Sequence, residues 1–178
     1  MGNQKRYQLW FAQNYLAMPE NESLIVDLIR FICCVYHPSN AILSSDIVPR
    51  WAVIGWLLNI VKSSTIQANA KLALFYDWFY FNPQVDNIMN IEPGMLLMIH
   101  SIPKYAPFTA QLLEFILYVM EMYYPAACDM IRKGVRNSLQ IMLSKGVIPY
   151  VLFCLLFRFF NVLLCCAVLW SLWLLALL

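Results

Sequence analysis

The sequence predicts an all-α fold built from consecutive helical hairpins, followed by a hydrophobic C-terminal helix. Apolar residues recur at the three-and-four spacing of a helix face through most of the chain, and prolines mark the short connections between these segments. Five glycines in 178 residues and helix-period patterning argue against an all-β fold. Short connections make neighbouring helices antiparallel.

Two helices are expected before the centre of the chain. The first spans residues 5–17, and the second follows a loop at residues 20–23 whose serine caps it. Asp27 and Arg30 can pair on the outside of this second helix. Residues 37–40 contain a proline and break it. Its shared apolar face is formed by Leu24, Leu28, Phe31 and Val35.

Residues 44–82 predict a central pair of helices around which the rest of the chain packs. Residues 44–46 resemble a helix cap, and Ser64 followed by Gln67 forms a capping-box pattern for the second helix, which runs through Phe81. The first helix places on one face Ile47, Trp51, Ile54, Leu58 and Val61. The second carries two apolar stripes, Leu72–Phe75–Phe79 and Leu74–Trp78–Phe81. A helix with so much apolar surface needs neighbours on more than one side.

The remaining body is expected to form three more helices. One spans about residues 91–100, a proline-marked connector covers residues 101–108, and a second helix runs from Thr109 to the residue before Pro125. Its repeating apolar face holds Leu112, Ile116, Val119 and Tyr123. The last helix spans residues 127–145, with Ile131, Val135 and Met142 inward and with Arg132, Lys133, Arg136 and Gln140 outward.

This order of helices predicts an irregular HEAT-like solenoid over residues 1–146, because helices arrive in pairs separated by short connections. A compact helical bundle is the competing architecture. Residues 147–178 form a separate hydrophobic tail.

The composition offers little support for catalysis. The chain is 62% hydrophobic and 12% charged, and its net charge of +2 gives no general electrostatic reason to bind nucleic acid. It contains two histidines and lacks the common hydrolase, nucleotide and zinc motifs, so we expect no enzyme activity, cofactor or metal. We interpret the six cysteines as buried thiols acting as small hydrophobic groups.

Two polar features stand out against this background. Arg132, Lys133 and Arg136 are the one basic cluster and a weak candidate for binding an acidic partner or a phosphate, although a solvated helix face is the preferred interpretation. Asp77 lies within an aromatic run and should need a donor or a cation such as Arg50, in a structural role. The glycosylation pattern at residues 21–23 is interpreted as a helix cap.

The hydrophobic tail has three interpretations. Residues 159–178 are long enough to cross a membrane once, and Lys145 and Arg158 before them would keep the body in the cytoplasm, as in a tail-anchored protein. A buried terminal helix is the second interpretation. The third is translated intron at the end of a truncated transcript, which would make the chain a non-functional product.

Four segments carry a family resemblance and keep their order and spacing over most of the chain. They are QKRYQLWF at 4–11, VYHPSNAILSSDIVPRWAVIGWLL at 35–58, NAKLALFYDWFYFNP at 69–83 and DNIMNIEPGMLLMIHS at 86–101. In these segments the chain resembles the family of Integrator complex subunit 3, whose members are also components of the SOSS complex, a sensor of single-stranded DNA. The similarity weakens through residues 108–145 and stops near Pro149.

The resemblance implies a nuclear, all-helical, HEAT-like scaffold without catalytic activity. Its implied partners are an OB-fold protein that binds single-stranded DNA, the small third component of SOSS, and other Integrator subunits, so nucleic acid is reached only indirectly. Its implied roles are the DNA damage response and DNA repair, small nuclear RNA processing and control of transcription. By this resemblance residues 1–146 correspond to part of the family's N-terminal half and act through protein–protein interaction.

Overall fold

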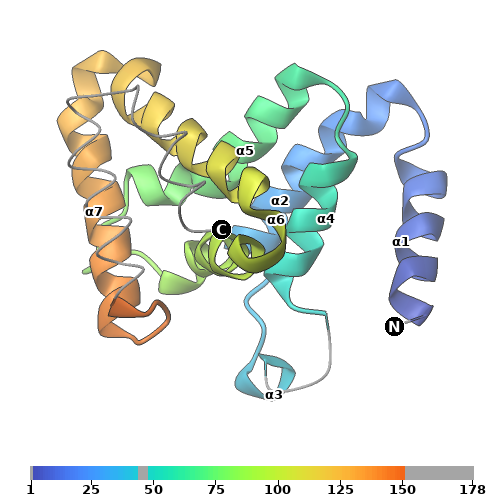
Figure 1. Ribbon diagram of the computed structural model, residues 1–178, viewed down its shortest axis with the longest axis horizontal. Helices are drawn as coiled ribbons and strands as arrows, with labels where there is room; N and C mark the ends of the chain where they lie inside the picture. Colours follow the sequence, from blue (N-terminus) through green and yellow to red (C-terminus); the bar gives the residue numbers. More distant parts are fainter. Residues whose placement is uncertain (1, 44–47, 151–178) are drawn as a thin grey trace.

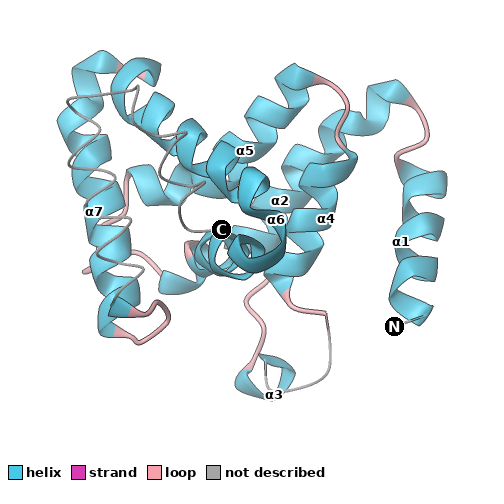
Figure 2. Cartoon of the chain, in the orientation of Figure 1, coloured by secondary structure: helices cyan, strands magenta, loops and turns pink. Residues whose placement is uncertain are grey.

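A computed structural model describes residues 2–43 and 48–150, in which helices are joined by loops and no strand occurs among the described residues (Figure 1, Figure 2). The α-helices are α1 (Gly2–Tyr15), α2 (Leu24–Cys34), α3 (Asn40–Leu43), α4 (Arg50–Ile60), α5 (Ser64–Phe79), α6 (Glu92–Tyr118) and α7 (Cys128–Ser144). Shorter turns are η1 (Pro19–Ser23), η2 (Ile88–Asn90), the π-turn η3 (Val119–Tyr123) and η4 (Pro125–Ala127). The all-α prediction is confirmed, whereas the hydrophobic C-terminal helix expected at residues 159–178 lies outside the described residues.

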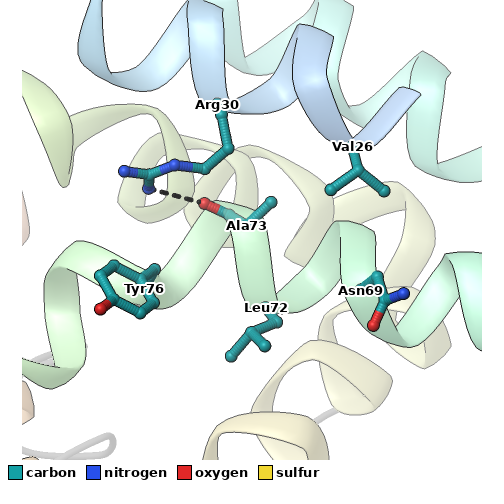
Figure 3. A pocket seen from close by; sticks show the side chains of 6 residues that line it. All are labelled: Val26, Arg30, Asn69, Leu72, Ala73 and Tyr76. Atoms are coloured by element: carbon teal, nitrogen blue, oxygen red, sulfur yellow. Dashed lines mark hydrogen bonds between the residues drawn. The ribbon is translucent and has the colours of Figure 1, made fainter. Parts of the chain in front are cut away.

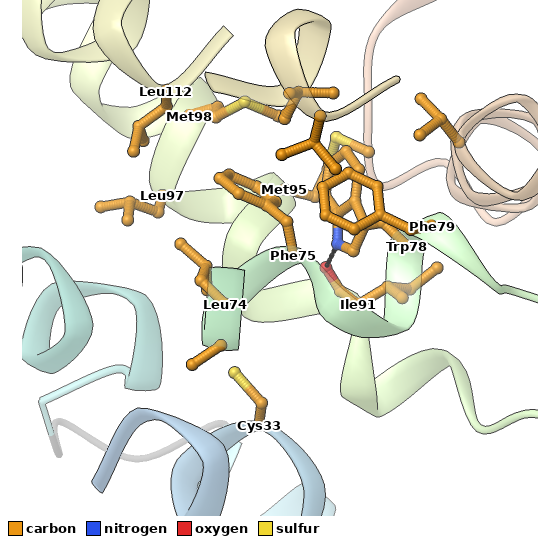
Figure 4. Close-up of a cluster of buried hydrophobic side chains, with 14 of the residues drawn as sticks. Cys33, Leu74, Phe75, Trp78, Phe79, Ile91, Met95, Leu97, Met98 and Leu112 are labelled. Carbon is orange, nitrogen blue, oxygen red and sulfur yellow. Dashed lines mark hydrogen bonds between the residues drawn. The ribbon is translucent and has the colours of Figure 1, made fainter. Parts of the chain in front are cut away.

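Helix α5 is the centre of the core. It packs against α2, α4, α6 and α7, which confirms that its apolar surface needs several neighbours. In Figure 1 α7 lies on one side of the molecule and α1 on the other, with α5 between them. The side chains of Phe75, Trp78 and Phe79 are at most 1% exposed. Trp78 Nε1 donates to the Ile91 carbonyl at 3.1 Å, which satisfies the polar atom of the largest buried ring (Figure 4).

Helix α7 follows the predicted pattern and crosses α5 closely. Its buried residues include Ile131, Val135 and Met142, as predicted. An added Cβ at Gly134 would lie 2.3 Å from the Phe79 carbonyl oxygen, so glycine is what allows this approach.

The crossing also serves the end of α5. Asn137 Nδ2 donates to the Phe81 carbonyl at 3.2 Å, and Ser138 Oγ donates to the Trp78 carbonyl at 3.4 Å. Trp78 lies in the last turn of α5 and Phe81 lies two residues beyond its end, so two side chains of α7 bind backbone carbonyls where the chain leaves α5.

The predicted inward face of α2 is wrong. Leu24, Phe31 and Val35 are 42%, 50% and 67% exposed, and Leu28 is half-buried. The buried residues of the helix are Ile25, Ile29 and Cys33. The predicted face runs beside Asp27, whereas the buried face lies on the side away from it, in contact with α4 and α5.

The predicted helix caps also need correction. Ser63, and not Ser64, caps α5, because Ser63 Oγ accepts from the Ile66 amide at 3.4 Å. The expected partner Gln67 is replaced by Glu22 of η1, whose carboxylate accepts from the Lys62 and Ser63 amides.

Two further predictions of helix caps concern the starts of α2 and α4. Ser23 gives α2 no side-chain cap, and its hydroxyl donates to the Glu20 carbonyl at 3.3 Å. The expected cap at residues 44–46 lies outside the described residues, and α4 begins at Arg50, directly after Pro49. Ile54 and Leu58 are buried as expected, together with Leu57.

The break predicted at residues 101–108 is confirmed, but it is shorter than the expected connector. Two helical arms of α6 meet at a kink at Tyr105, where φ is −138° and ψ is 43°. Pro103 and Pro107 each lack an amide donor, which explains a bend in place of a regular ladder. Ser101 Oγ and Thr109 Oγ1 lie 2.7 Å apart inside the bend and join its two arms.

The apolar face predicted for the helix that follows the kink is confirmed in part. Leu112, Ile116 and Val119 are buried, but Tyr123 is 52% exposed. The π-turn η3 adds a residue to the last turn and rotates Tyr123 away from the core.

Candidate functional site

Asp77 forms the centre of a polar contact between α2 and α5. Its Oδ2 accepts from Arg30 Nη1 at 2.7 Å and from Cys34 Sγ at 3.2 Å. Arg30 Nη1 also donates to the Ala73 carbonyl at 3.1 Å (Figure 3). The expected partner Arg50 is therefore wrong, and so is the expected pair between Asp27 and Arg30. Local sequence cannot reveal that α2, rather than α4, places its cation beside Asp77.

Arg50 is instead part of a second buried contact. It is 6% exposed, and its Nη1 donates to the Ile32 and Tyr36 carbonyls at 3.1 and 3.3 Å. Its Nη2 pairs with Glu92 at the start of α6. Arg50 thus joins the end of α2 to the beginnings of α4 and α6, which is a structural role.

The two neighbouring cysteines on α2 are poor nucleophiles. Burial, followed by the adjacent Cys34, raises the pKa of Cys33 to about 12. Burial, followed by the hydrogen bond to Asp77, raises the pKa of Cys34 to about 11. Both thiols stay protonated at neutral pH, so neither supplies a reactive thiolate. Cys33 is fully buried, which confirms its interpretation as a small hydrophobic group, and Cys34 is half-buried.

The two histidines are held in separate structural contacts. His37 Nε2 donates to the Cys33 carbonyl at 3.2 Å and to Asn90 Oδ1 at 3.0 Å, which fixes the proton on that nitrogen. His100 stacks on Trp51, with ring centroids 4.5 Å apart. Among residues 2–43 and 48–150, no group of three histidine, cysteine, aspartate or glutamate side chains could hold a metal ion.

The predicted basic cluster lies on the outer face of α7. Arg132 is 31% exposed, with its Nη1 3.7 Å from Asp129 Oδ1, while Lys133 and Arg136 are exposed. An exposed ion pair at this distance contributes little free energy. The cluster therefore remains a weak candidate for binding an acidic partner.

A hollow between α2 and α5 is the feature that the sequence interpretation missed. Its volume is about 340 Å³, and it is lined by Val26, Arg30, Asn69, Leu72, Ala73 and Tyr76 (Figure 3). The four α5 residues are spaced i, i+3, i+4 and i+7, so they share one face of that helix. This spacing could have identified the face from the sequence. Helical periodicity, however, also places Leu72 in an apolar stripe with Phe75 and Phe79, which favoured the interpretation of Leu72 as a core residue.

The described part of the chain also contains no helix long and apolar enough to cross a membrane. The tail at residues 159–178, which carries the membrane hypothesis, lies outside the described residues.

Comparison with known proteins gives a consistent match. Residues 1–156 match the family described as Integrator complex subunit 3 N-terminal. The chain is 56% identical over 148 residues to an Integrator complex subunit 3 homolog of Dictyostelium discoideum, covering 83% of this chain and 10% of that protein. It is 51% identical over 150 residues to Integrator complex subunit 3 of Danio rerio, covering 84% and 15%, and 51% identical over 150 residues to that of Mus musculus, covering 84% and 14%. The chain thus spans only a small part of the length of these relatives.

Proposed function

Because this chain belongs to the family of Integrator complex subunit 3, we propose that it is a non-catalytic helical scaffold segment of the Integrator complex. The family match over residues 1–156 is the observation that carries the proposal. The polar contacts of the described residues support it, because the pairs Arg30–Asp77 and Arg50–Glu92 join helices to one another. We extend the proposal to a HEAT-like solenoid over residues 1–146, with residues 147–178 as a separate tail.

In finer detail, we propose that the scaffold links an OB-fold protein that binds single-stranded DNA, and the small third component of SOSS, to other Integrator subunits in the nucleus. Contact with nucleic acid is then indirect. Such an assembly would act in the DNA damage response, DNA repair, small nuclear RNA processing and transcription. Its partners would bind the exposed helix faces, among them the basic face of Arg132, Lys133 and Arg136.

Co-purification tests this proposal. Affinity-tagged chain is recovered from nuclear extract and blotted for Integrator subunits and for the OB-fold protein. Gly134→Leu serves as the disrupted control, because a side chain there collides with the Phe79 carbonyl, and Gln140→Ala on the exposed side of α7 serves as the matched control. We expect recovery with the unaltered chain and Gln140→Ala but not with Gly134→Leu. Recovery of Integrator subunits no greater than with Gly134→Leu would contradict the scaffold role, and loss of the OB-fold protein alone would contradict the SOSS link.

A tail-anchored membrane protein is the second candidate, favoured by the strongly apolar character of residues 159–178. Under this hypothesis the chain stays in the membrane fraction after a carbonate wash, and deletion of residues 159–178 releases it. Release of the full chain by the wash would exclude this candidate.

A further inference from the structure

The hollow between α2 and α5 is lined mostly by apolar groups and by one charged residue. Val26, Leu72 and Ala73 supply the apolar surface, and Asn69 lies at one end (Figure 3). Of the six lining residues only Arg30 carries a formal charge. Its volume of about 340 Å³ lies near the lower end of the range for ligand sites, so it fits one or two side chains of a larger partner.

Arg30 uses one of its three guanidinium nitrogens to bond to α5. Its hydrogen bonds to Asp77 and to the Ala73 carbonyl both use Nη1. Nε and Nη2 take no part in the bonds to Asp77 and Ala73, and the side chain is 35% exposed. The thiol of Cys34 is a further hydrogen-bonding neighbour of the Arg30 guanidinium group. A guanidinium group is always charged and presents these donors as one planar edge that matches a carboxylate.

Next to the hollow lie the rings of Tyr76 and Tyr80, which we call the tyrosine shelf. Tyr76 lines the hollow and lies 5.3 Å from Tyr80, ring centroid to ring centroid. Tyr76 is 48% exposed and Tyr80 is half-buried. Such rings offer a broad apolar face and a hydroxyl donor at little cost in conformational entropy, which is why tyrosine is enriched at protein interfaces.

Arg30 also connects the two parts of this surface. Its guanidinium carbon lies 5.4 Å from the centroid of the Tyr76 ring, so the cation and the first ring of the shelf are held together. An occupant must therefore match an apolar hollow, the partly exposed donor edge of an arginine that is also paired with Asp77, and the phenol groups of Tyr76 and Tyr80. A peptide segment with an apolar side chain next to a carboxylate meets all three requirements.

We propose that the surface formed by the α2–α5 hollow and the tyrosine shelf binds an acidic-hydrophobic peptide segment of a partner protein. An apolar side chain of the segment enters the hollow over Leu72 and Ala73. A neighbouring carboxylate accepts hydrogen bonds from Nε and Nη2 of Arg30, and the segment continues across Tyr76 and Tyr80. This inference rests on the proposed scaffold role, to which it adds a docking surface and the chemistry of the partner.

Fluorescence polarisation with the full chain tests the proposal. The probe is a labelled 12-residue peptide that contains alternating leucine and glutamate pairs, and two matched peptides replace glutamate by glutamine or leucine by serine. We expect saturable binding of the first peptide and binding at least about tenfold weaker for each of the others, because a charge-assisted hydrogen bond and the burial of an apolar side chain each contribute that much. Binding should also weaken as salt is raised.

Two variants locate the contact. Asn69→Glu places a negative charge at the edge of the hollow, and Ala68→Glu places the same charge on the neighbouring exposed position of α5. Asn69→Glu should weaken binding about tenfold or more, whereas Ala68→Glu should leave it within about twofold. Circular dichroism of both variants checks that they remain folded.

The proposal is overturned by any of three results: no saturable binding of the glutamate peptide, equal binding of the glutamine peptide, or equal loss in both variants. Tighter binding of a proline-rich peptide or of an oligothymidine would likewise replace the proposed partner chemistry. Peptide binding is measured on purified protein and co-purification in nuclear extract, so a failure of the docking surface and a failure of the scaffold role are told apart.

Discussion

Gly134→Ala tests the close crossing of α7 and α5. A Cβ added at residue 134 would lie 2.3 Å from the Phe79 carbonyl oxygen, 2.5 Å from the Phe79 carbonyl carbon and 2.7 Å from the Trp78 carbonyl oxygen. These are backbone atoms, so no side chain can rotate out of the way. Helix α7 must therefore move away from α5 by about 1 Å to reach ordinary contact distance.

The expected cost has three parts. Overpacking of a buried contact costs about 1–3 kcal/mol, and here the obstacle is backbone. The shift also lengthens the hydrogen bonds of Asn137 and Ser138 to α5, now 3.2 and 3.4 Å, beyond useful range, at about 1 kcal/mol each. Alanine regains about 1 kcal/mol of helix propensity relative to glycine. The net destabilisation is therefore about 2–4 kcal/mol.

Thermal unfolding followed by circular dichroism measures this loss. For a chain of this length 1 kcal/mol corresponds to about 2–4 °C, so Tm should fall by about 5–15 °C. Gln140→Ala, at an exposed position of the same helix, is the control and should leave Tm within about 2 °C. An unchanged or raised Tm for Gly134→Ala would mean that helix propensity outweighs the crossing, and would refute the close approach of α7 to α5.

Three further predictions concern the polar contacts and the thiols. Asp77→Ala should lower the unfolding free energy by about 1–2 kcal/mol because Arg30 then lacks its carboxylate partner. An unchanged thermal melt would show that the Arg30–Asp77 pair does not stabilise the fold. Ser101→Ala should cost about 1–3 kcal/mol by leaving the buried Thr109 hydroxyl without its partner, and adding Thr109→Val should cost less than the sum of the single changes; strict additivity in urea unfolding would contradict the contact. Burial raises the pKa of Cys33 from 9.0 to about 12, so its contribution to stability is complete below pH 9 and is lost as the pH rises toward 12. In the native protein at pH 8, the peptide that contains Cys33 should therefore stay unmodified by an alkylating reagent. Modification at the rate of the urea-unfolded chain would refute the burial of Cys33.

The sequence predicted best those helices with one clear apolar face. In α7 the inward residues Ile131, Val135 and Met142 alternate with charged ones, so helical spacing alone identified its buried side. In α2 the same reasoning selected Leu24 and Phe31, which are exposed, because it followed one apolar stripe and did not use the polar side marked by Asp27. Periodicity identifies a helix more reliably than it orients one.

Contacts between distant residues could not be predicted from local pattern. Asp77 was correctly expected to need a donor, but its partner Arg30 lies 47 positions earlier and depends on the packing of α2 against α5. The hollow beside it depends on the same packing, since α2 and α5 each supply part of its lining. Its α5 residues share a helix face in the sequence, yet only the position of α2 makes that face concave.

Both ends of α5 are completed by segments remote from it in the chain. Glu22 accepts from the Lys62 and Ser63 amides, and Asn137 and Ser138 donate to the carbonyls at the other end. During synthesis the partner of the first end of α5, Glu22, is therefore made before the helix itself. The side-chain donors at its second end become available only when α7 has been made, about sixty residues later. The core should consequently close in one late step, when nearly the whole described body is available.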